Sequence, residues 1–405
     1  MRAYERLLKY VTYWTTSDET TGTTPSTARQ KILGEALTEE LLALGVDSAE
    51  MDGQGYVYAV LKATEGKENA PAVGFIAHMD TAPDFSGENV KPLVTTNYDG
   101  CDKELGNGIT LRVADFPHLP SLKGRTLITA DGTTLLGADD KAGVAEIMTL
   151  AERLITDKIP HGKICIAFTP DEEIGEGADH FDVPRFGADF GYTVDGDREG
   201  GVEYENFNAA GAEVTVKGFS VHPGSSKDTM INASLVAMEF NAMLPAADIP
   251  RHTVGYEGFF HLTDMQGDVS KATLSYIIRD HDAASFACRE KTMTHIAAIL
   301  NEKYGDGTVT LSIKEQYRNM AEMVLPHRHI IDRAIAAAER VGVTPFIAPV
   351  RGGTDGARLS FMGLPCPNLG TGGYAFHGPY EHITAEGMDA VVDILTEIVR
   401  SYANS

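Results

Sequence analysis

The stretch Lys163-Ile164-Cys165-Ile166-Ala167-Phe168-Thr169-Pro170-Asp171-Glu172-Glu173 is a short apolar run that ends in carboxylates. A continuous apolar run of this length is typical of a strand that is buried on both faces of a sheet. Two further runs have the same form: residues 73–77 lead into His78-Met79-Asp80, and residues 190–194 lead into Asp195. Because the carboxyl ends of parallel strands meet at one edge of a sheet, we expect these polar side chains to gather there.

Strands and helices alternate around these runs, which is typical of a mostly parallel sheet with helices on its faces. Spacing predicts strands at residues 56–61, 73–77, 163–168 and 190–194 and helices at 141–154, 330–340 and 386–402. Near the N-terminus, apolar residues at helical spacing between Tyr4 and Trp14 predict one helix. A second is predicted to begin at Pro25 and to end at Gly45. The polar stretch 83–123 is expected to form a hairpin excursion over the site.

The pattern changes between residues 208 and 317. Strands are predicted at residues 212–216, 258–262, 273–278 and 308–313, with helices at 230–244 and 284–300. Their order is the β-α-β-β-α-β order of a ferredoxin-like unit. We therefore predict an α/β catalytic domain with a central mixed sheet, formed by residues 1–207 and 318–405, and an inserted α+β lid domain formed by residues 208–317.

Length and composition agree with a two-domain protein. A chain of 405 residues exceeds the roughly 250–300 residues at which single cores stop growing. The net charge of −24 argues against nucleic acid or an anionic membrane surface as a partner. The four cysteines are scattered, the N-terminus lacks the apolar core of a signal peptide, and no apolar stretch reaches the roughly 20 residues of a membrane span. We expect a soluble, cytoplasmic protein.

The acidic strand ends predict a binuclear metal site. Carboxylates that crowd beside a histidine repel one another unless a cation compensates. Mixed nitrogen and oxygen donors suit zinc, with cobalt or manganese as substitutes. In Gly137-Ala138-Asp139-Asp140-Lys141, one aspartate caps or orients a helix while the other ligates, and the residues alone do not decide which. The pattern predicts a metal-dependent hydrolase.

Adjacent side chains after a strand diverge, so that one glutamate of Glu172-Glu173 can bind metal while the other moves the proton of the attacking water. A remaining nitrogen ligand is expected from His377 or His382. His377 is preferred because Gly378 permits close approach of the backbone, whereas His382 leads into the final helix. Asp80 is placed to accept the second ring N–H of His78.

Several longer stretches carry a resemblance to a known family. They are AHMDTAPD, LLGADDKAGVAEIM, FTPDEEIGEGADHFD, YTVDGD, VHPG, YIIRDHD and RGGTDGARLSFMGLPCPNLGTGGYAFHG. Over essentially its whole length the chain resembles the peptidase T family of tripeptide aminopeptidases, within the di-zinc aminoacylase and carboxypeptidase superfamily of metallopeptidases. The resemblance implies two zinc ions per subunit. It implies that His78, Asp140, Glu173, Asp195 and His377 are ligands with Asp140 as the bridge, that Asp80 orients His78, and that Glu172 is the general base.

The inserted domain carries Ser220-Val221-His222-Pro223-Gly224. Similar domains in the superfamily mediate homodimerisation and present this histidine to a neighbouring active site, where it stabilises the oxyanion. Arg279 and Arg351 are of the type that binds a peptide carboxylate bidentately. The chain departs from the family pattern at Pro379-Tyr380 and Glu381-His382, directly after the last ligand motif.

The expected activity is hydrolysis of the N-terminal peptide bond of short peptides, tripeptides above all, by a metal-bound hydroxide with Glu172 as general base. The alternatives on the same framework are a dipeptidase, a carboxypeptidase and an N-acyl amino acid deacylase. A non-catalytic peptide- or metal-binding protein is a further alternative, against which the intact Glu172 argues because binding needs only the ligands.

Overall fold

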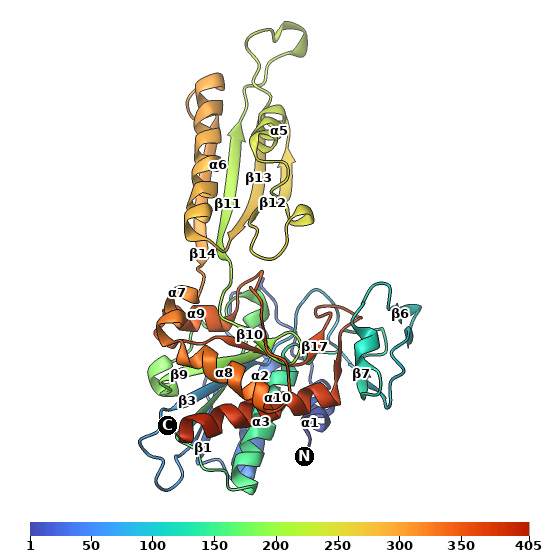
Figure 1. Cartoon of the computed structure of the whole chain (residues 1–405). Coiled ribbons are helices and arrows are strands. Elements are labelled where there is room, and N and C mark those ends of the chain that lie inside the picture. Colours follow the sequence, from blue (N-terminus) through green and yellow to red (C-terminus); the bar gives the residue numbers. More distant parts are fainter. Residues whose placement is uncertain (405) are drawn as a thin grey trace. The chain divides into compact units, whose positions relative to one another are not determined.

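The computed structural model describes residues 1–404, which form two compact units (Figure 1). Unit 1 contains Met1–Tyr204, Met320–Ala348 and the chain from Thr354 onward, and unit 2 contains Glu205–Asn319 and Pro349–Gly353. The predicted fold class is confirmed: one unit is α/β around a mixed sheet, and the other is built on a separate antiparallel sheet. Residues 349–353, which were expected in the large domain, have their contacts in unit 2.

The large sheet of unit 1 is mixed. Its strands, in spatial order, are β1 (Ser48–Met51), β2 (Val57–Leu61), β8 (Ile164–Thr169), β3 (Val73–His78), β9 (Phe190–Gly196), β16 (Asn368–Gly370), β10 (Gly201–Glu203) and β15 (Phe346–Ile347). β3 pairs in parallel with both β8 and β9, and β16 pairs in parallel with β9. The carboxyl ends of β3, β8 and β9 therefore lie at one edge, as predicted.

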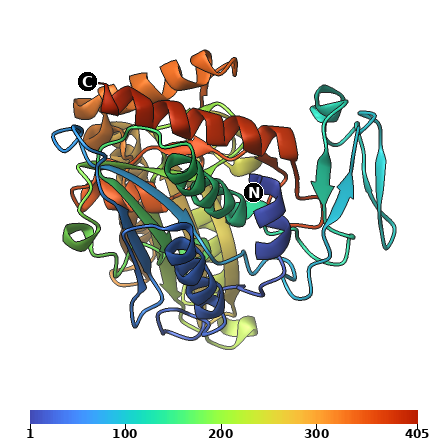
Figure 2. The ribbon, with the colours of Figure 1, turned by 90° about the horizontal axis from the view of Figure 1, so that it is seen from below.

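The two faces of this sheet are covered by different helices. Ile164, Ile166 and Phe168 of β8 belong to the larger core, whereas Cys165 and Ala167 belong to a smaller core on the other face. This double burial explains the continuous apolar run. The larger core includes residues of α1 (Ala3–Tyr10), α2 (Gln30–Leu44), α3 (Ala138–Thr156), α8 (His329–Arg340) and α10 (Ala385–Ala403), and Figure 2 shows α3 and α10 alongside each other. The smaller core includes residues of α4 (Val183–Phe186) and α9 (Asp355–Phe361), and the short helix α7 (Ala321–Val324) precedes α8.

The two N-terminal helices differ from the prediction in their bounds. α1 ends at Tyr10, short of Trp14, and α2 begins at Gln30 rather than at Pro25, although it does end before Gly45. The backbone N–H and the hydroxyl of Ser26 donate to the carboxylate of Asp171, at 2.6 and 2.5 Å. These bonds hold the chain after Pro25 out of the helix.

Two smaller antiparallel assemblies complete unit 1. One sheet has the order β17 (Gly373–Tyr374), β18 (His382–Thr384), β7 (Leu127–Thr129) and β4 (Leu93–Thr95). The other is a hairpin of β5 (Lys103–Gly106) and β6 (Ile109–Leu111), which lies within the stretch where a hairpin was expected. The chain between β17 and β18 contains His377.

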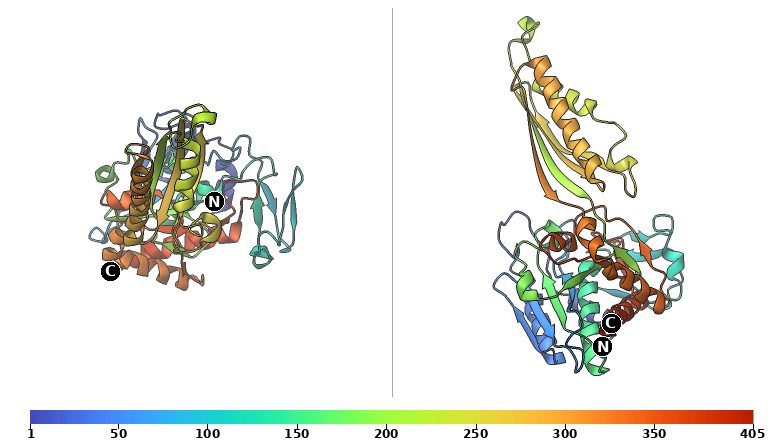
Figure 3. Two further views of the ribbon diagram at one scale, coloured as in Figure 1. Left: turned by 90° about the horizontal axis from the view of Figure 1, so that it is seen from above. Right: turned by 60° about the vertical axis from the view of Figure 1, so that its left-hand side comes forward.

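Unit 2 is a four-stranded antiparallel sheet with two helices on one face (Figure 3, right). The sheet order is β12 (Phe259–Gly267), β13 (Lys271–Asp280), β11 (Asn208–Lys217) and β14 (Val309–Tyr317), and the helices are α5 (Ala233–Met243) and α6 (Ala283–Tyr304). Alternate residues of β13 are buried, because one face of the sheet packs on the helices. Across both units, none of the helices in residues 1–404 is long and apolar enough to cross a membrane.

Candidate metal centre and active site

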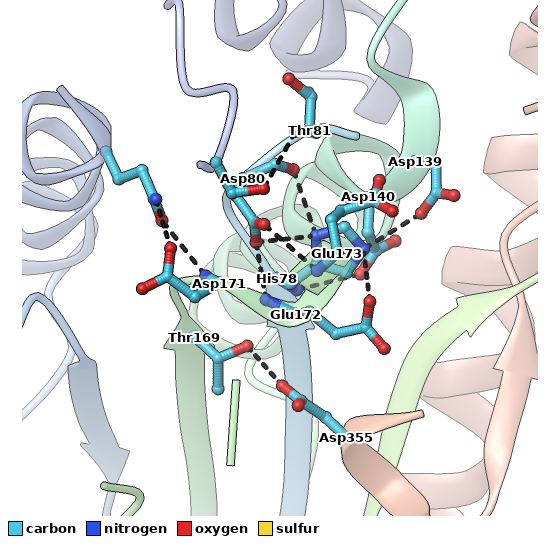
Figure 4. Close-up of polar contacts among 12 residues, drawn as sticks. His78, Asp80, Thr81, Asp139, Asp140, Thr169, Asp171, Glu172, Glu173 and Asp355 are labelled. Atoms are coloured by element: carbon cyan, nitrogen blue, oxygen red, sulfur yellow. Dashed lines mark hydrogen bonds and ion pairs between the residues drawn. The ribbon is translucent and has the colours of Figure 1, made fainter. Parts of the chain in front are cut away.

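The predicted site residues of unit 1 come from five segments that meet at the carboxyl edge of the large sheet. Figure 4 shows three of these segments, with His78, the Asp139–Asp140 pair and the Glu172–Glu173 pair close together. His78 ends β3, and Asp195 is the penultimate residue of β9. The remaining residues lie in a 3-10 turn after β8, at the start of α3 and in the β17–β18 loop; they are Glu172, Glu173, Asp139, Asp140 and His377. The gathering predicted from the sequence is present.

His78 faces several carboxylates through one ring nitrogen. Its Nε2 lies 3.1 Å from Asp139 Oδ1, 3.3 Å from Asp195 Oδ1 and 4.0 Å from Glu172 Oε2. Its Nδ1 donates to the main-chain carbonyl of Asp80 at 3.1 Å. This bond assigns the proton of the neutral ring to Nδ1 and leaves the Nε2 lone pair for a cation.

His377 faces a second set of oxygens. Its Nε2 lies 3.2 Å from Asp139 Oδ2 and 3.0 Å from Glu173 Oε2, and its Nδ1 lies 3.6 Å from Asp84 Oδ2. The two oxygens of Asp139 are therefore divided between the two histidines. Glu173 Oε1 is buried and has no hydrogen-bond partner within residues 1–404. Two groups of mixed nitrogen and oxygen donors thus share one carboxylate.

Asp140 is held differently from its neighbour. Its carboxylate accepts the backbone N–H of His78 and that of Gly143, both at 3.2 Å. It also lies close enough to the ring of His78 and to Asp195 to complete a three-residue metal group. A Cβ at Gly143 would lie 1.9 Å from the carbonyl oxygen of Val194, so only glycine fits where α3 meets β9.

The electrostatics of this cluster fit bound cations. Burial, with a contribution from Asp139, raises the pKa of Glu173 to about 8, and burial raises that of Asp195 to about 6. Hydrogen bonds to Asp139 and Glu173 raise the pKa of His377 to about 11. Without metal, these raised pKa values favour protonated side chains in the cluster. Bound divalent cations would neutralise the same carboxylates instead. The mixed donors and the unpartnered oxygen of Glu173 fit such ions.

Asp80 supports the site through its carboxylate. Its Oδ1 accepts the backbone N–H of Glu172 at 3.0 Å, and its Oδ2 accepts that of Glu173 at 3.2 Å. The expected contact with His78 is longer, at 3.4 Å from Nδ1 to Oδ1. Asp80 therefore fixes the turn that presents both glutamates and borders the histidine ring.

Glu381 and Asp355 are two buried carboxylates near the site for which the sequence predicted no role. Glu381 accepts the backbone N–H groups of Leu136 and Gly137 at 2.8 Å and that of Asp139 at 2.9 Å, and burial raises its pKa to about 7. Asp355 accepts the hydroxyl of Thr169 at 2.8 Å, and burial raises its pKa to about 7. Both act across long sequence separations, which leave no local signal in the sequence. His382, the alternative to His377, binds His118 instead of joining the cluster.

The three predicted substrate-binding residues lie in unit 2. His222 is exposed on the chain between β11 and α5, where its Nδ1 accepts the N–H of Gly224 at 3.1 Å. Arg279 donates from Nη1 to the carbonyls of Ala210 and Ile278 at 3.2 and 2.9 Å. Arg351 donates from Nη1 to the carbonyls of residues 255 and 257, at 2.6 and 3.0 Å, and from Nη2 to the hydroxyl of residue 253 at 3.0 Å.

Histidines and carboxylates that surround a shared aspartate, at the carboxyl edge of an α/β sheet, define a metal-dependent hydrolase. The chain belongs to peptidase family M20/M25/M40, whose model matches residues 130–401, and within that family it groups with the peptidase T proteins. It is 57% identical over 403 residues to peptidase T of Clostridium perfringens, and the aligned region covers 99% of both chains. It is 51% identical over 404 residues to peptidase T of Caldanaerobacter subterraneus, and the aligned region covers 99% of this chain and 98% of the relative. The predicted family is confirmed.

Two solved structures share the fold. A tripeptidase from Staphylococcus aureus superposes with a TM-score of 0.80 at 22% identity, covering 100% of this chain and 98% of that one. An aminopeptidase PepT from Bacillus cereus gives the same TM-score and identity, with 99% and 98% covered.

Proposed function

We propose that this peptidase removes the N-terminal residue of short peptides, tripeptides above all, with two zinc ions bound in unit 1. The relatives named peptidase T support the substrate class. The observation that carries the metal site is the division of the Asp139 oxygens between His78 and His377, at 3.1 and 3.2 Å. Cobalt or manganese would suit the same donors.

In this proposal His78 and Asp195 would hold one ion, Glu173 and His377 would hold the other, and Asp139 would be shared between them. The family resemblance implied that Asp140 is the bridge, whereas the residues alone left the choice between Asp139 and Asp140 open. The geometry favours Asp139, because both oxygens of Asp140 already accept backbone N–H groups. When bound, such ions polarise a peptide carbonyl and lower the pKa of water toward about 7.

Glu172 is the proposed general base. Its carboxylate lies beside the cluster, with Oε2 4.0 Å from His78 Nε2, and most of the side chain is shielded from solvent, with 16% exposed. Burial, and then Asp195, raise its pKa well above the ordinary value of a glutamate. A carboxylate with a raised pKa accepts the proton of the attacking water and returns it to the leaving amine. Asp80 holds the backbone of Glu172 in place for this transfer.

Unit 2 is proposed to mediate a homodimer and to act as the lid, with His222 stabilising the oxyanion in its own or a neighbouring site. Of the two arginines, Arg279 is the better carboxylate ligand. Within residues 1–404 the guanidinium of Arg279 donates hydrogen bonds from Nη1 alone, whereas both terminal nitrogens of Arg351 bind the 253–257 segment. A cytoplasmic location, expected from the sequence, also stays a proposal.

A substrate panel tests the proposed function. The zinc-loaded protein would be incubated with a free tripeptide, its N-acetylated form, a dipeptide and an N-acetyl amino acid, and the products separated by mass. We expect the free tripeptide to give its first residue and a dipeptide, and the acetylated form to resist hydrolysis. Faster cleavage of the N-acetyl amino acid would identify a deacylase, release of the last residue a carboxypeptidase, and preference for the dipeptide a dipeptidase.

A further inference from the structure

His118 and His382 form a direct imidazole–imidazole contact in unit 1. Their Nε2 atoms lie 2.8 Å apart, the ring centroids lie 5.0 Å apart, and the planes differ by 5°. Stacked rings could not bring these nitrogens so close, so the two rings lie end to end in one plane. The contact is an N–H···N hydrogen bond.

The protonation of this pair follows from its second contacts. His382 Nδ1 donates to the carbonyl of Tyr380 at 2.7 Å, so the Nε2 of the neutral ring carries a lone pair. His118 must then supply the N–H between the rings. Burial lowers the pKa of both histidines, that of His382 to about 4, which keeps His382 neutral near pH 7.

The same histidine also contacts the other end of the β17–β18 loop. Tyr374 and His382 are register partners at the base of this loop, on β17 and β18. The ring of Tyr374 stacks on His118 at 4.2 Å between centroids, with 10° between planes. Both ends of the loop are therefore fastened to His118. The loop between them contains His377, which has the left-handed φ of 64° that a residue other than glycine rarely adopts.

His118 itself is well fixed. Its carbonyl accepts the N–H of Ser121 at 2.8 Å, at the start of the 3-10 turn Leu119–Leu122. Leu119 and Leu122 are buried in a small core of their own. The imidazole thus has a rigid base from which to hold a strained loop.

We propose that His118 is a positioning residue, which through its hydrogen bond to His382 and its stacking on Tyr374 holds the β17–β18 loop so that His377 reaches the metal centre. This inference rests on the proposed role of His377 as a ligand. It assigns to a histidine outside the metal cluster control over the occupancy of one of the two metal positions.

The test measures zinc stoichiometry against free zinc by equilibrium dialysis in His118→Phe, His118→Gln and His377→Ala. Phenylalanine keeps a flat ring for Tyr374 but has no N–H, whereas the glutamine amide restores a donor. We expect His118→Phe to bind the second zinc about 10–100-fold more weakly with the first unaffected, the range typical of residues that support a ligand. His118→Gln should recover most of that affinity. His327→Phe, at an exposed histidine of unit 1, is the matched control and should bind both ions normally.

The possible results distinguish the positioning role of His118 from the proposed role of His377 as a metal ligand. If His377→Ala loses the second zinc while folded His118→Phe and His118→Gln keep it, the positioning role is wrong and the proposed ligand role stands. If His377→Ala binds two zinc ions normally, the ligand role fails and the inference fails with it. Equal weakening of both zinc ions in His118→Phe, without recovery in His118→Gln, would show a general structural defect and would also overturn the proposal.

Discussion

Asp139 and Asp140 are adjacent in the chain yet use their carboxylates in different ways. Asp139 directs its oxygens at two histidine rings, and Asp140 accepts two backbone N–H groups. From the sequence, one cap and one ligand could be expected, but not which residue takes which role. The choice depends on the backbone direction at the start of α3, where Glu381 binds the N–H of Asp139 from 242 positions away.

Substitutions of the two glutamates after β8 should have different effects, one on the rate of hydrolysis and the other on zinc binding. We expect Glu172→Gln to lower kcat by at least about 10²-fold, the lower range for a lost acid–base group, with nearly intact zinc content. Glu173→Gln should lose zinc as well, because its oxygens face His377 and an unpartnered position. Elemental analysis and single-turnover rates on one preparation distinguish the two. Loss of both ions from Glu172→Gln would require the roles to be exchanged.

Asp80→Asn tests the support beneath these glutamates. An amide offers only one acceptor oxygen, whereas Asp80 accepts two N–H groups, so that one of them would face an NH₂ group. We expect a folded protein with kcat/KM about 10–100-fold lower. Asp52→Asn is a suitable control, because that aspartate accepts backbone N–H groups of a turn between β1 and β2. Normal kinetics and normal zinc affinity in Asp80→Asn would show that Asp80 does not support the active site.

At the scale of elements, the spacing of apolar residues was sufficient to predict a strand or helix wherever the apolar positions of that segment are the buried ones. β8 lies one residue from its predicted position and β3 has one residue more than predicted, because their apolar runs pack on both faces. The start of α2 was wrong because Asp171, far along the chain, binds Ser26 and Gln30. Short strands such as β10 and β15 were not predicted, since two or three residues carry too little periodicity.

An ion-pair network anchors α1 and should contribute to the free energy of unfolding in a pH-dependent way. Arg6 is 1% exposed, and its guanidinium binds Glu40 and Glu152, each at 2.9 Å. We expect Glu40→Gln to reduce the free energy of unfolding by about 2 kcal/mol near pH 7, the size of a hydrogen bond to a charged group. Chemical denaturation of the variant and the wild type measures this difference.

The sign of the pH effect follows from the pKa of Glu40. Burial opposes ionisation, but hydrogen bonds from Lys9 and Arg6 outweigh it and lower the pKa. A lowered pKa in the folded state stabilises the protein above the unfolded value of about 4.3, and this contribution is lost as pH falls through the folded value. The difference between wild type and Glu40→Gln should therefore shrink below about pH 4. A difference that does not change with pH would contradict the assigned ion pair.

At the scale of the whole molecule, selectivity for peptide length requires recognition of both peptide ends. We expect Arg279→Met to depress kcat/KM for free tripeptides about 10–100-fold, from the roughly 1.5–3 kcal/mol of a charge-assisted hydrogen bond, and to spare their C-terminal amides. Arg351→Met should instead lower activity on acids and amides alike, because Arg351 holds the 253–257 segment. Equal losses on acid and amide in Arg279→Met would remove Arg279 as the carboxylate ligand.

The central claim is that two metal ions share Asp139. The direct measurement is the anomalous diffraction of a crystal of the zinc-loaded protein, recorded on both sides of the zinc edge. Two peaks are predicted, one bound by His78 and Asp195 and one by Glu173 and His377, with one oxygen of Asp139 on each. A single peak, or two peaks bridged by Asp140 with Asp139 turned away, would contradict it.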